Sequence, residues 1–349
     1  MSAGVYNYGG TLELERGGRL VSPAIAYRMW GEPLPDGSNV VWVCHALTAN
    51  ADVFDWWPGL FGAGNLFDPK DRCIICANIF GSCYGTAGPL TENPETGKPY
   101  FAGFPEVTIR DMVAAHRLLA NHLGIDRIGL IIGGSLGGMQ ALEWAVTEPE
   151  RFDSLIPIAT NAAHSPWGMA FNASQRMAIE ADTTWGMPAP DAGLAGMRAA
   201  RSIALLSYRH YDTYRKTQSP GADDPDFHYP ADSYQRYQGE KLARRFNAYS
   251  YHLLSRAMDS HNLGRGRGSV ERALARVTAE VTVVGISNDL LFPPEEQARI
   301  ARGVRHGVFR SIESAYGHDG FLIETEELAS VISEFIPHLQ PTFQNKAKT

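Results

Sequence analysis

Short apolar runs alternate with longer amphipathic segments over most of this chain. Runs typical of buried strands occupy residues 39–44, 73–78, 128–132, 152–159, 281–286 and 308–312. Between them, residues 108–123 carry an apolar stripe at helical spacing that Gly124 ends, and residues 138–145 and 327–335 are also helical in pattern. Strands that alternate with helices predict an α/β fold with a mostly parallel central sheet.

Two segments of this chain depart from that alternation. Residues 11–15 and 21–30 predict an opening antiparallel pair with a turn at Gly17-Gly18. Residues 165–267 predict helices rich in Met, Arg, Tyr and Gln, interrupted by a polar stretch at 219–232. We therefore expect an inserted helical cap at 165–267, on a core made of residues 1–164 and 268–349.

Composition removes several functional classes. The chain has 349 residues, of which 44% are hydrophobic and 20% are charged, so it can bury a large core. Its formal net charge of −7 disfavours binding to nucleic acid. No apolar run is long enough to span a membrane and no signal peptide precedes the first strand, so we expect a cytoplasmic protein that does not act at a membrane. The segment Gly264-Arg-Gly-Arg-Gly268 occurs once, and we interpret it as the hinge where the cap rejoins the core rather than as an RNA-binding tract.

The four cysteines, at positions 44, 73, 76 and 83, favour packing over chemistry. Cys73 and Cys76 form a CxxC pair, but the pair lies inside a strand-like segment, where alternate residues face opposite sides. No second ligand pair accompanies them. We therefore expect reduced cysteines in a core and no metal site.

A serine stands at the most informative position of the sequence. Gly133-Gly134-Ser135-Leu136-Gly137 follows the apolar run 128–132 and opens the helical segment 138–145. A strand, a glycine-flanked serine and a helix make a nucleophile elbow, in which a strained turn exposes the hydroxyl above the sheet. The pattern predicts that Ser135 is an acyl-accepting nucleophile.

The serine needs a base, and the base needs a carboxylate that orients it. In α/β-hydrolases these follow the serine in the order Asp, then His, on loops after late strands. Asp289 follows the strand at 281–286 and His318 follows the strand at 308–312, so both match that order. We predict a Ser135–His318–Asp289 triad.

A tetrahedral oxyanion also requires two backbone N–H donors. One is expected from Leu136, directly after the nucleophile, and the other from Leu47, in the loop after the strand at 39–44. His45 lies in the same loop, and we interpret it as a residue that fixes the loop, because His318 already matches the position of the base.

With these residues placed, longer segments of the chain resemble the homoserine O-acetyltransferase family. The resemblance rests on Cys44-His45-Ala46-Leu47-Thr48, Asp55-Trp56-Trp57, Gly81-Ser82-Cys83-Tyr84-Gly85, Thr108-Ile109-Arg110-Asp111-Met112, Gly133 to Trp144, and Tyr316-Gly317-His318-Asp319. It implies an α/β-hydrolase fold with a helical cap, a homodimer, and no permanently bound cofactor. It also implies ping-pong transfer of acetyl from acetyl-CoA, the co-substrate, through Ser135 to L-homoserine in methionine biosynthesis.

The resemblance implies two further site residues. Arg201, in Gly193-Leu194-Ala-Gly-Met-Arg198-Ala-Ala-Arg201, matches the family's ligand for the substrate carboxylate, and Asp319 matches its ligand for the substrate ammonium. A planar guanidinium can bind a carboxylate with two parallel hydrogen bonds, which favours arginine in this role. Arg198 and Arg209 are the nearest alternatives to Arg201.

Two departures from the family leave alternatives open. Leu136 stands where methionine is common, and Gly320 stands where alanine is common, both beside the expected acyl and acceptor pockets. Succinyl transfer to homoserine and O-acylation of serine therefore stay open, as does simple ester hydrolysis. A non-catalytic binding protein on a hydrolase fold is the alternative from another class.

Overall fold

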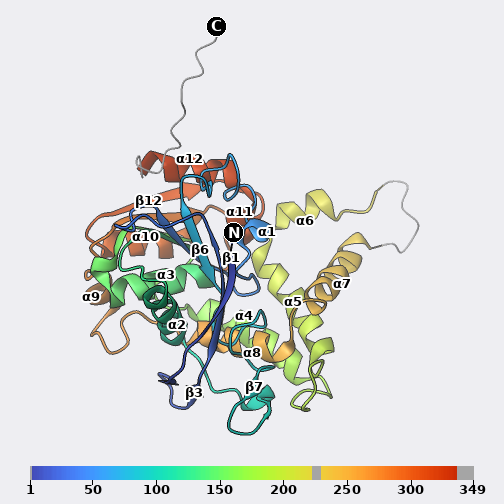
Figure 1. Ribbon diagram of the computed structural model, residues 1–349. Coiled ribbons are helices and arrows are strands. Elements are labelled where there is room, and N and C mark those ends of the chain that lie inside the picture. The colour runs from blue at the N-terminus through green and yellow to red at the C-terminus, as the bar shows by residue number, and fades with distance from the viewer. Residues whose placement is uncertain (1, 222–228, 336–349) are drawn as a thin grey trace.

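The computed structural model describes residues 2–221 and 229–335 and is built on one central sheet (Figure 1). Its eight strands have the order β1-β4-β6-β5-β9-β10-β11-β12. β1 pairs antiparallel with β4, and β4 pairs antiparallel with β6, whereas the remaining neighbours are parallel. The strands are β1 Ser2–Asn7, β4 Ala24–Trp30, β5 Val40–Cys44, β6 Cys73–Ala77, β9 Ile128–Gly134, β10 Phe152–Ile158, β11 Glu280–Ile286 and β12 Gly307–Ile312.

Helices cover both faces of this sheet, which is why its inner strands are apolar at every position. Alternate residues of β5 and β6 enter two separate hydrophobic cores: Trp42 and Ile75 face one core, and Val43 and Cys76 face the other. The first core is closed by α2 Ile109–His122, α3 Leu136–Thr147, α9 Val270–Leu274 and α10 Pro294–Gly303. The second is closed by α1 Val53–Trp56, α11 Gly320–Ile323 and α12 Thr325–Phe335.

The predicted strands and helices of the core are present with small shifts at their ends. Helix α2 starts where the pattern places it, because Thr108 accepts a hydrogen bond from the Asp111 N–H while the Asp111 side chain bonds back to the Thr108 N–H. All four cysteines are free, and those at positions 44, 73 and 76 are buried. Three of the cysteines therefore pack in the core as predicted, and Cys83 is only partly buried against it.

The prediction for the amino-terminal pair was wrong in one respect. Residues Thr11–Glu13 (β2) pair with Arg19–Val21 (β3), but the apolar run does not continue as one strand to residue 30. Ser22 has a positive φ of 47° and Pro23 follows it, so the chain breaks there. β4 then joins the central sheet, where it pairs with β1, a strand that the pattern did not predict.

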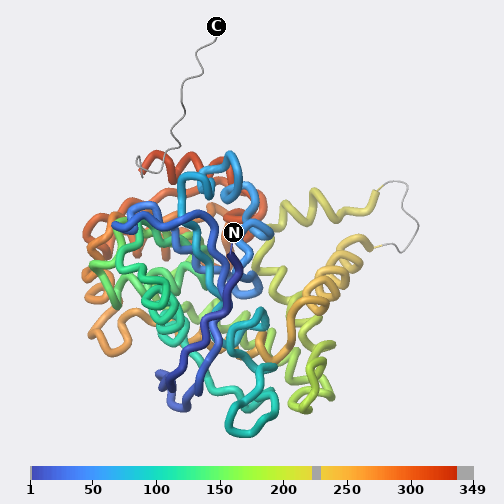
Figure 2. Tube along the Cα trace, in the orientation of Figure 1, coloured from blue at the N-terminus to red at the C-terminus, as the bar shows by residue number. Residues whose placement is uncertain are grey.

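Among the described residues of the region predicted as a cap, five helices are inserted between β10 and β11. Figure 1 and Figure 2 show α5, α6 and α7 projecting from one side of the sheet domain. The five are α4 Pro166–Glu180, α5 Leu194–Tyr208, α6 Tyr211–Thr217, α7 Pro230–Ala243 and α8 Ala248–Asp259. Residues 222–228 of this region, and residues 336–349 at the end of the predicted core, lie outside the described residues.

The remaining elements are short. They are the strands β7 Glu92–Asn93 and β8 Lys98–Pro99 and the 3₁₀ turns η1 Phe101–Gly103, η2 Pro149–Arg151 and η3 Gly317–Asp319. None of the described helices is both long and apolar enough to cross a bilayer. Within the same residues, no cluster of three or more His, Cys, Asp or Glu side chains could hold a metal ion.

Arginines of the predicted hinge segment bind the core through acidic residues. Arg267 donates to both carboxylate oxygens of Glu143 on α3, at 2.9 and 2.5 Å, and the Glu143 side chain is only 2% exposed. Arg265 binds Glu15 at 2.7 Å, and Arg110 on α2 binds the same carboxylate at 2.8 Å. The segment between α8 and α9 is therefore fastened to the sheet domain by ion pairs, which explains its arginines without nucleic acid.

Arg267→Ala should destabilise the fold by about 1.5–3 kcal/mol, because it removes the bidentate partner of the buried Glu143 carboxylate. Arg110 would remain, with its Nε 3.3 Å from Glu143. Urea denaturation of the variant and the parent measures this difference. The matched control is Arg299→Ala, whose solvent-exposed ion pair with Glu271 should contribute little to stability. Equal midpoint shifts in the two variants would contradict the argument.

Candidate active site

The elbow serine lies between β9 and α3 in a strained conformation. Ser135 has φ 57° and ψ −124°, a region that non-glycine residues rarely occupy. Its N–H donates to the Ile158 carbonyl at 2.9 Å, and its own carbonyl accepts from the Thr160 hydroxyl at 2.9 Å. The adjacent strand β10 and the loop after it therefore hold the turn in place from both sides of the peptide.

Glycines around the serine permit backbone contact between β5 and α3. A Cβ on Gly137 would overlap the Cys44 carbonyl at the end of β5, and a Cβ on Gly133 would overlap the Gly137 carbonyl. A side chain at either position would push the helix away from the sheet. The elbow glycines thus bring the start of α3 against the loop that contains Leu47.

Asp289 and His318, which the sequence placed as partners, are in contact. The Nδ1 of His318 donates to Oδ2 of Asp289 at 2.7 Å, and both side chains are almost fully buried. The other oxygen of Asp289 accepts from the N–H groups of Leu291 and Phe292, both at 2.8 Å. Both oxygens are therefore occupied, which fixes the carboxylate and leaves Nε2 on the far side of the imidazole ring.

Aromatic side chains hold the His318 ring in place next to the elbow. Ring centroids of Tyr208, Phe292 and Phe321 lie 5.5, 5.2 and 5.5 Å from that of His318. The Phe321 ring also fills the space where a Cβ on Gly134 would lie, so it connects the histidine to the residue before Ser135. Among the described residues, the Oγ of Ser135 makes no hydrogen bond to the His318 ring.

The environment of His318 controls its proton affinity. Burial is the largest influence and disfavours the charged ring, but the charge and hydrogen bond of Asp289, with a smaller contribution from Asp319, outweigh it. The net effect raises the pKa of His318 above its ordinary value of 6.5. A histidine with a raised pKa is a stronger base for removing a hydroxyl proton.

The two predicted oxyanion donors come from the loop after β5 and from the first turn of α3. The N–H groups of Leu47 and Leu136 have no backbone or side-chain acceptor within the described residues, so neither is used for structure. His45 is buried, and its Nδ1 lies 2.8 Å from the Ala46 carbonyl. Burial lowers the pKa of His45 to about 4, which makes it a poor base at neutral pH and agrees with a role in fixing the loop.

Ion pairs separate Arg201 from its two alternatives. Arg198 pairs with Glu240 at 2.7 Å, and Arg209 pairs with Asp319 at 3.2 Å. Arg201 has no carboxylate partner in the part of the chain that the structure describes, and its guanidinium lies over the Tyr208 ring, 5.4 Å from the centroid. Because Tyr208 also contacts His318, the Arg201 guanidinium and the predicted base lie against the same ring.

The Asp319 carboxylate has an ion-pair partner that the sequence did not indicate. It directly follows His318 in η3, and its Oδ2 is the oxygen that faces Arg209. The side chains of both residues are less than 20% exposed, at 16% and 19%. Sequence reasoning missed this ion pair, because nothing in the spacing of residues 209 and 319 indicates that α5 ends beside the histidine loop.

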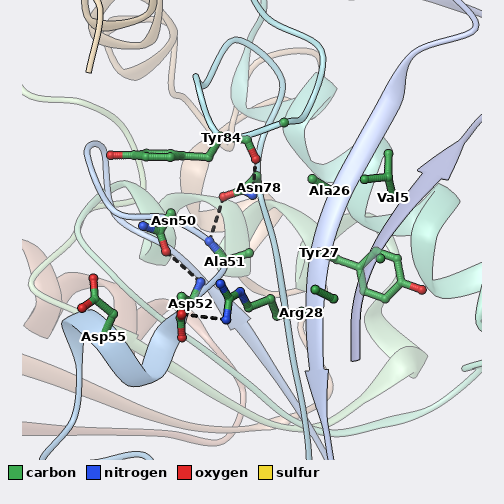
Figure 3. Close-up of a pocket in the computed structure, with 13 residues that line it drawn as sticks. Val5, Ala26, Tyr27, Arg28, Asn50, Ala51, Asp52, Asp55, Asn78 and Tyr84 are labelled. Atoms are coloured by element: carbon green, nitrogen blue, oxygen red, sulfur yellow. Dashed lines mark hydrogen bonds and ion pairs between the residues drawn. The ribbon is translucent and has the colours of Figure 1, made fainter. Parts of the chain in front are cut away.

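A separate cavity of about 510 Å³ lies between the edge strand β1 and the loop after β5 (Figure 3). Arg28 and Asp52 line it as an ion pair at 2.7 Å, and Asp55 adds a second carboxylate. Its lining is therefore net negative, which disfavours a phosphate-bearing ligand. The triad does not line this cavity, and we assign no substrate to it.

Sequence reasoning also missed the residues that support the triad. Trp57 donates its indole N–H to the Phe321 carbonyl at 2.9 Å, which links α1 to the segment after His318. Tyr208 and Phe321 lie far apart in sequence, and no local pattern distinguishes them from ordinary core residues. The segment Asp55-Trp56-Trp57 was part of the resemblance, and packing was expected to be its main role, as the structure confirms for Trp57.

Comparison with known proteins identifies the fold and the family. The alpha/beta hydrolase fold family matches residues 39–325. A homoserine O-acetyltransferase of Cyclobacterium marinum is 47% identical over 93% of this chain and 92% of its own length. The crystal structure of a homoserine O-acetyltransferase from Bacillus anthracis superimposes with a TM-score of 0.89 at 22% identity, covering 96% of this chain and 97% of that one.

The fold alone does not separate transfer from hydrolysis. The crystal structure of esterase E22 superimposes almost as well, with a TM-score of 0.87 at 22% identity over 97% of this chain and 100% of that one. The sequence identity to the Cyclobacterium marinum protein, over nearly the full length of both chains, is far higher. On this similarity, the chain belongs to the homoserine O-acetyltransferase family, within the alpha/beta hydrolase fold.

Proposed function

We propose that this protein is a homoserine O-acetyltransferase that transfers acetyl from acetyl-CoA to L-homoserine through an acyl-enzyme on Ser135. The proposal rests above all on the 47% identity to a homoserine O-acetyltransferase over 93% of the chain. The Asp289–His318 hydrogen bond of 2.7 Å supports it, because it orients a base of the kind that acyl transfer needs. The product, O-acetylhomoserine, would enter methionine biosynthesis.

In the first half-reaction, Ser135 attacks the thioester carbonyl. Its Oγ forms the new C–O bond while Nε2 of His318 takes the hydroxyl proton, and Asp289 stabilises the imidazolium. The N–H groups of Leu47 and Leu136 would bind the oxyanion. The C–S bond then breaks, His318 returns the proton to the leaving thiolate, and acetyl-Ser135 remains.

In the second half-reaction, the acceptor hydroxyl replaces the thiol. His318 removes the proton of the homoserine hydroxyl as its oxygen attacks the acetyl-enzyme carbonyl. The same two N–H groups bind the second oxyanion. Collapse breaks the bond to Ser135, the serine oxygen recovers a proton from His318, and the acetylated amino acid leaves.

Acceptor recognition would use two opposite charges near the base. Arg201 is the arginine of the three candidates that lacks a carboxylate partner in the described structure, so its guanidinium can bind the substrate carboxylate. Asp319 would bind the ammonium group through Oδ1, since Oδ2 faces Arg209. An esterase for simple esters has no need of this pair.

Transfer also requires that water be kept away from the acyl-enzyme. Ser135 is 6% exposed and His318 is 3% exposed, so the reacting groups lie beneath the surface. Helix α5 approaches the histidine loop through Tyr208 and Arg209. We propose that residues 165–267 act as a cap that covers the acyl-enzyme and holds the acceptor against it.

Exposed apolar side chains on the inserted helices support a homodimer that associates through the cap. Trp167 and Met177 on α4 and Leu206 on α5 are 54%, 66% and 56% exposed. Exposed large apolar side chains such as these are candidates for contact with a second copy of the chain. Light scattering after size-exclusion chromatography should therefore give twice the mass of one chain.

Arg201→Ala should raise the KM for homoserine by about 10- to 100-fold, because a charged hydrogen bond contributes about 1.5–3 kcal/mol. The KM for acetyl-CoA should change little. Initial rates with each substrate varied in turn measure both constants. The matched control is Arg198→Ala, one turn earlier on α5 and paired with Glu240, which should leave both constants near those of the parent. Equal increases for the two substrates in Arg201→Ala would contradict the assignment.

The reaction itself is tested by thiol release from acetyl-CoA or succinyl-CoA with homoserine, serine or no amino acid. We expect rapid release only with acetyl-CoA and homoserine together. Release with succinyl-CoA or with serine would assign the alternative donor or acceptor. Thiol release at the same rate with and without an amino acid would indicate a hydrolase. No acylation by any donor would indicate a binding protein.

A further inference from the structure

A buried chain of hydrogen bonds lies beneath the elbow, and the three side chains that form it belong to none of the residues assigned so far to catalysis. It joins Trp42 on β5, His116 on α2 and Gln140 on α3, all of which are fully buried. Trp42 Nε1 donates to His116 Nδ1 at 3.3 Å, and His116 Nε2 lies 2.9 Å from Gln140 Oε1. Gln140 Nε2 then donates to two backbone carbonyls, those of His45 and Leu136, each at 3.1 Å.

The direction of every bond follows from the indole, which can only donate. His116 Nδ1 must therefore accept, so the neutral ring carries its proton on Nε2 and donates it to Gln140 Oε1. Burial lowers the pKa of His116 to about 4, which keeps the ring neutral at pH 7. With Oε1 occupied, the amide cannot flip, and its two N–H bonds point to the two carbonyls.

Those two carbonyls belong to the two segments that carry the oxyanion donors. The His45 carbonyl lies in the loop that supplies the Leu47 N–H. The Leu136 carbonyl lies in the first turn of α3, and the N–H of the same residue is the other donor. The segments come from different elements and touch where Gly137 meets the Cys44 carbonyl. One side chain therefore bonds to both halves of the oxyanion hole.

We propose that Gln140 is a positioning residue that sets the spacing of the Leu47 and Leu136 N–H groups, and that His116 holds its amide in the required orientation. This inference rests on the proposed function, because it takes those N–H groups as the oxyanion donors. Donors in an oxyanion hole must lie within a few tenths of an ångström of their place to stabilise the developing charge. A side chain that fixes both segments supplies that accuracy.

Packing alone would predict a different result from substitution. Gln140→Met keeps the length and volume of the side chain but removes both donors. If Gln140 only fills space, the variant retains its rate. If Gln140 sets the spacing, acylation slows although substrate binding does not change.

The test is stopped-flow acylation of Ser135 by p-nitrophenyl acetate, with an alkyl trifluoromethyl ketone as a mimic of the tetrahedral state. For Gln140→Met we expect the acylation rate constant to fall by about 10- to 100-fold, since loss of one oxyanion donor costs about 10²–10³. The affinity for the ketone should fall by a similar factor, while the KM for acetyl-CoA stays within about twofold. An unchanged rate and ketone affinity would overturn the inference.

Two further variants separate positioning from stability. Leu274→Ala, in the fully buried part of α9, should lower the melting temperature without slowing acylation. His116→Phe keeps an aromatic ring beside Trp144 but frees the Gln140 amide, so acylation should slow by a smaller factor. The double variant should be no slower than Gln140→Met, because both changes act through one amide; additive losses would contradict the relay.

Failure of the inference can be distinguished from failure of the proposed function. If the parent protein shows no burst of p-nitrophenolate, the acyl-enzyme on Ser135 is wrong. If the parent shows a burst and Gln140→Met matches it, only the positioning role is wrong. Should Gln140→Met not fold, His116→Phe provides the same measurement, and an unchanged rate there overturns the relay.

Discussion

Replacing Ser135 with alanine should abolish the acyl-enzyme and lower kcat by about 10⁴-fold or more. The hydroxyl is the atom that forms the covalent bond, and no other group in the mechanism can replace it. The backbone should not change, because alanine keeps the Cβ and the hydrogen bonds of Ser135 to Ile158 and Thr160 use only its peptide groups. Intact mass spectrometry after mixing with acetyl-CoA, and steady-state thiol release, measure the two effects.

The control for this variant is another buried serine. Ser154 lies on β10, is 3% exposed, and is not part of the proposed site. Ser154→Ala should form the acyl-enzyme at the rate of the parent. A stable acetyl adduct on Ser135→Ala would transfer the nucleophile to another residue and overturn the mechanism.

Asp289→Asn should lower kcat by about 10⁴-fold, because an amide favours the wrong tautomer of the His318 ring and cannot stabilise the imidazolium. The carboxylate now accepts from Nδ1 at 2.7 Å, while its other oxygen is bound by two backbone N–H groups. Those two bonds would hold an asparagine in the same place. The loss would therefore reflect the charge and the tautomer rather than a disordered loop.

The same variant should shift the pH profile. His318 must be neutral to act as a base, so kcat/KM of the parent falls as pH decreases through its raised pKa, above 6.5. Burial opposes protonation and Asp289 favours it, so removal of the Asp289 charge lowers the pKa and moves the acid limb to lower pH. Rates measured between pH 5 and pH 9, a range of about two units on each side of neutrality, should show this shift.

Glu296→Gln is the matched control for Asp289→Asn. Glu296 is a half-buried carboxyl on α10 that is close enough to feel the charge of Asp289, but it accepts its hydrogen bond from Asn161 rather than from the histidine. It should leave kcat and the acid limb close to those of the parent. If the acid limb of the Asp289→Asn profile lay at the same pH as that of the parent, His318 would not be the titrating base.

Local sequence patterns predicted the core of the fold well. The apolar strands and helix α2 follow from periodicity and from the Thr108–Asp111 cap, which involve residues close in sequence. Strand β1 was missed because its burial pattern has no fully buried position, and only pairing with β4 makes it a strand. The break at Ser22 was missed because residues 21–30 were interpreted as one strand, although Pro23 stands within them and disfavours a continuous strand.

The candidate site divides in a similar way. Ser135 could be found from its neighbours, and Asp289 and His318 could be found from their order after the last strands. The choice of Arg201 over Arg198 and Arg209 could not be made from the sequence, because all three lie in one segment. They differ only in whether a carboxylate pairs with them in the described structure.

The sequence by itself determined the elbow, the proposed order of the triad and the family, because each depends on short motifs whose chemistry is local. Only the tertiary structure decided which charges are paired and which side chain holds the two segments that carry the proposed oxyanion donors. Asp319 faces Arg209, and Gln140 bridges the loop after β5 to helix α3, because packing brings distant segments within hydrogen-bond distance. Ion pairs and hydrogen bonds depend on distances between atoms in the folded chain. The spacing of residues along the sequence does not determine those distances.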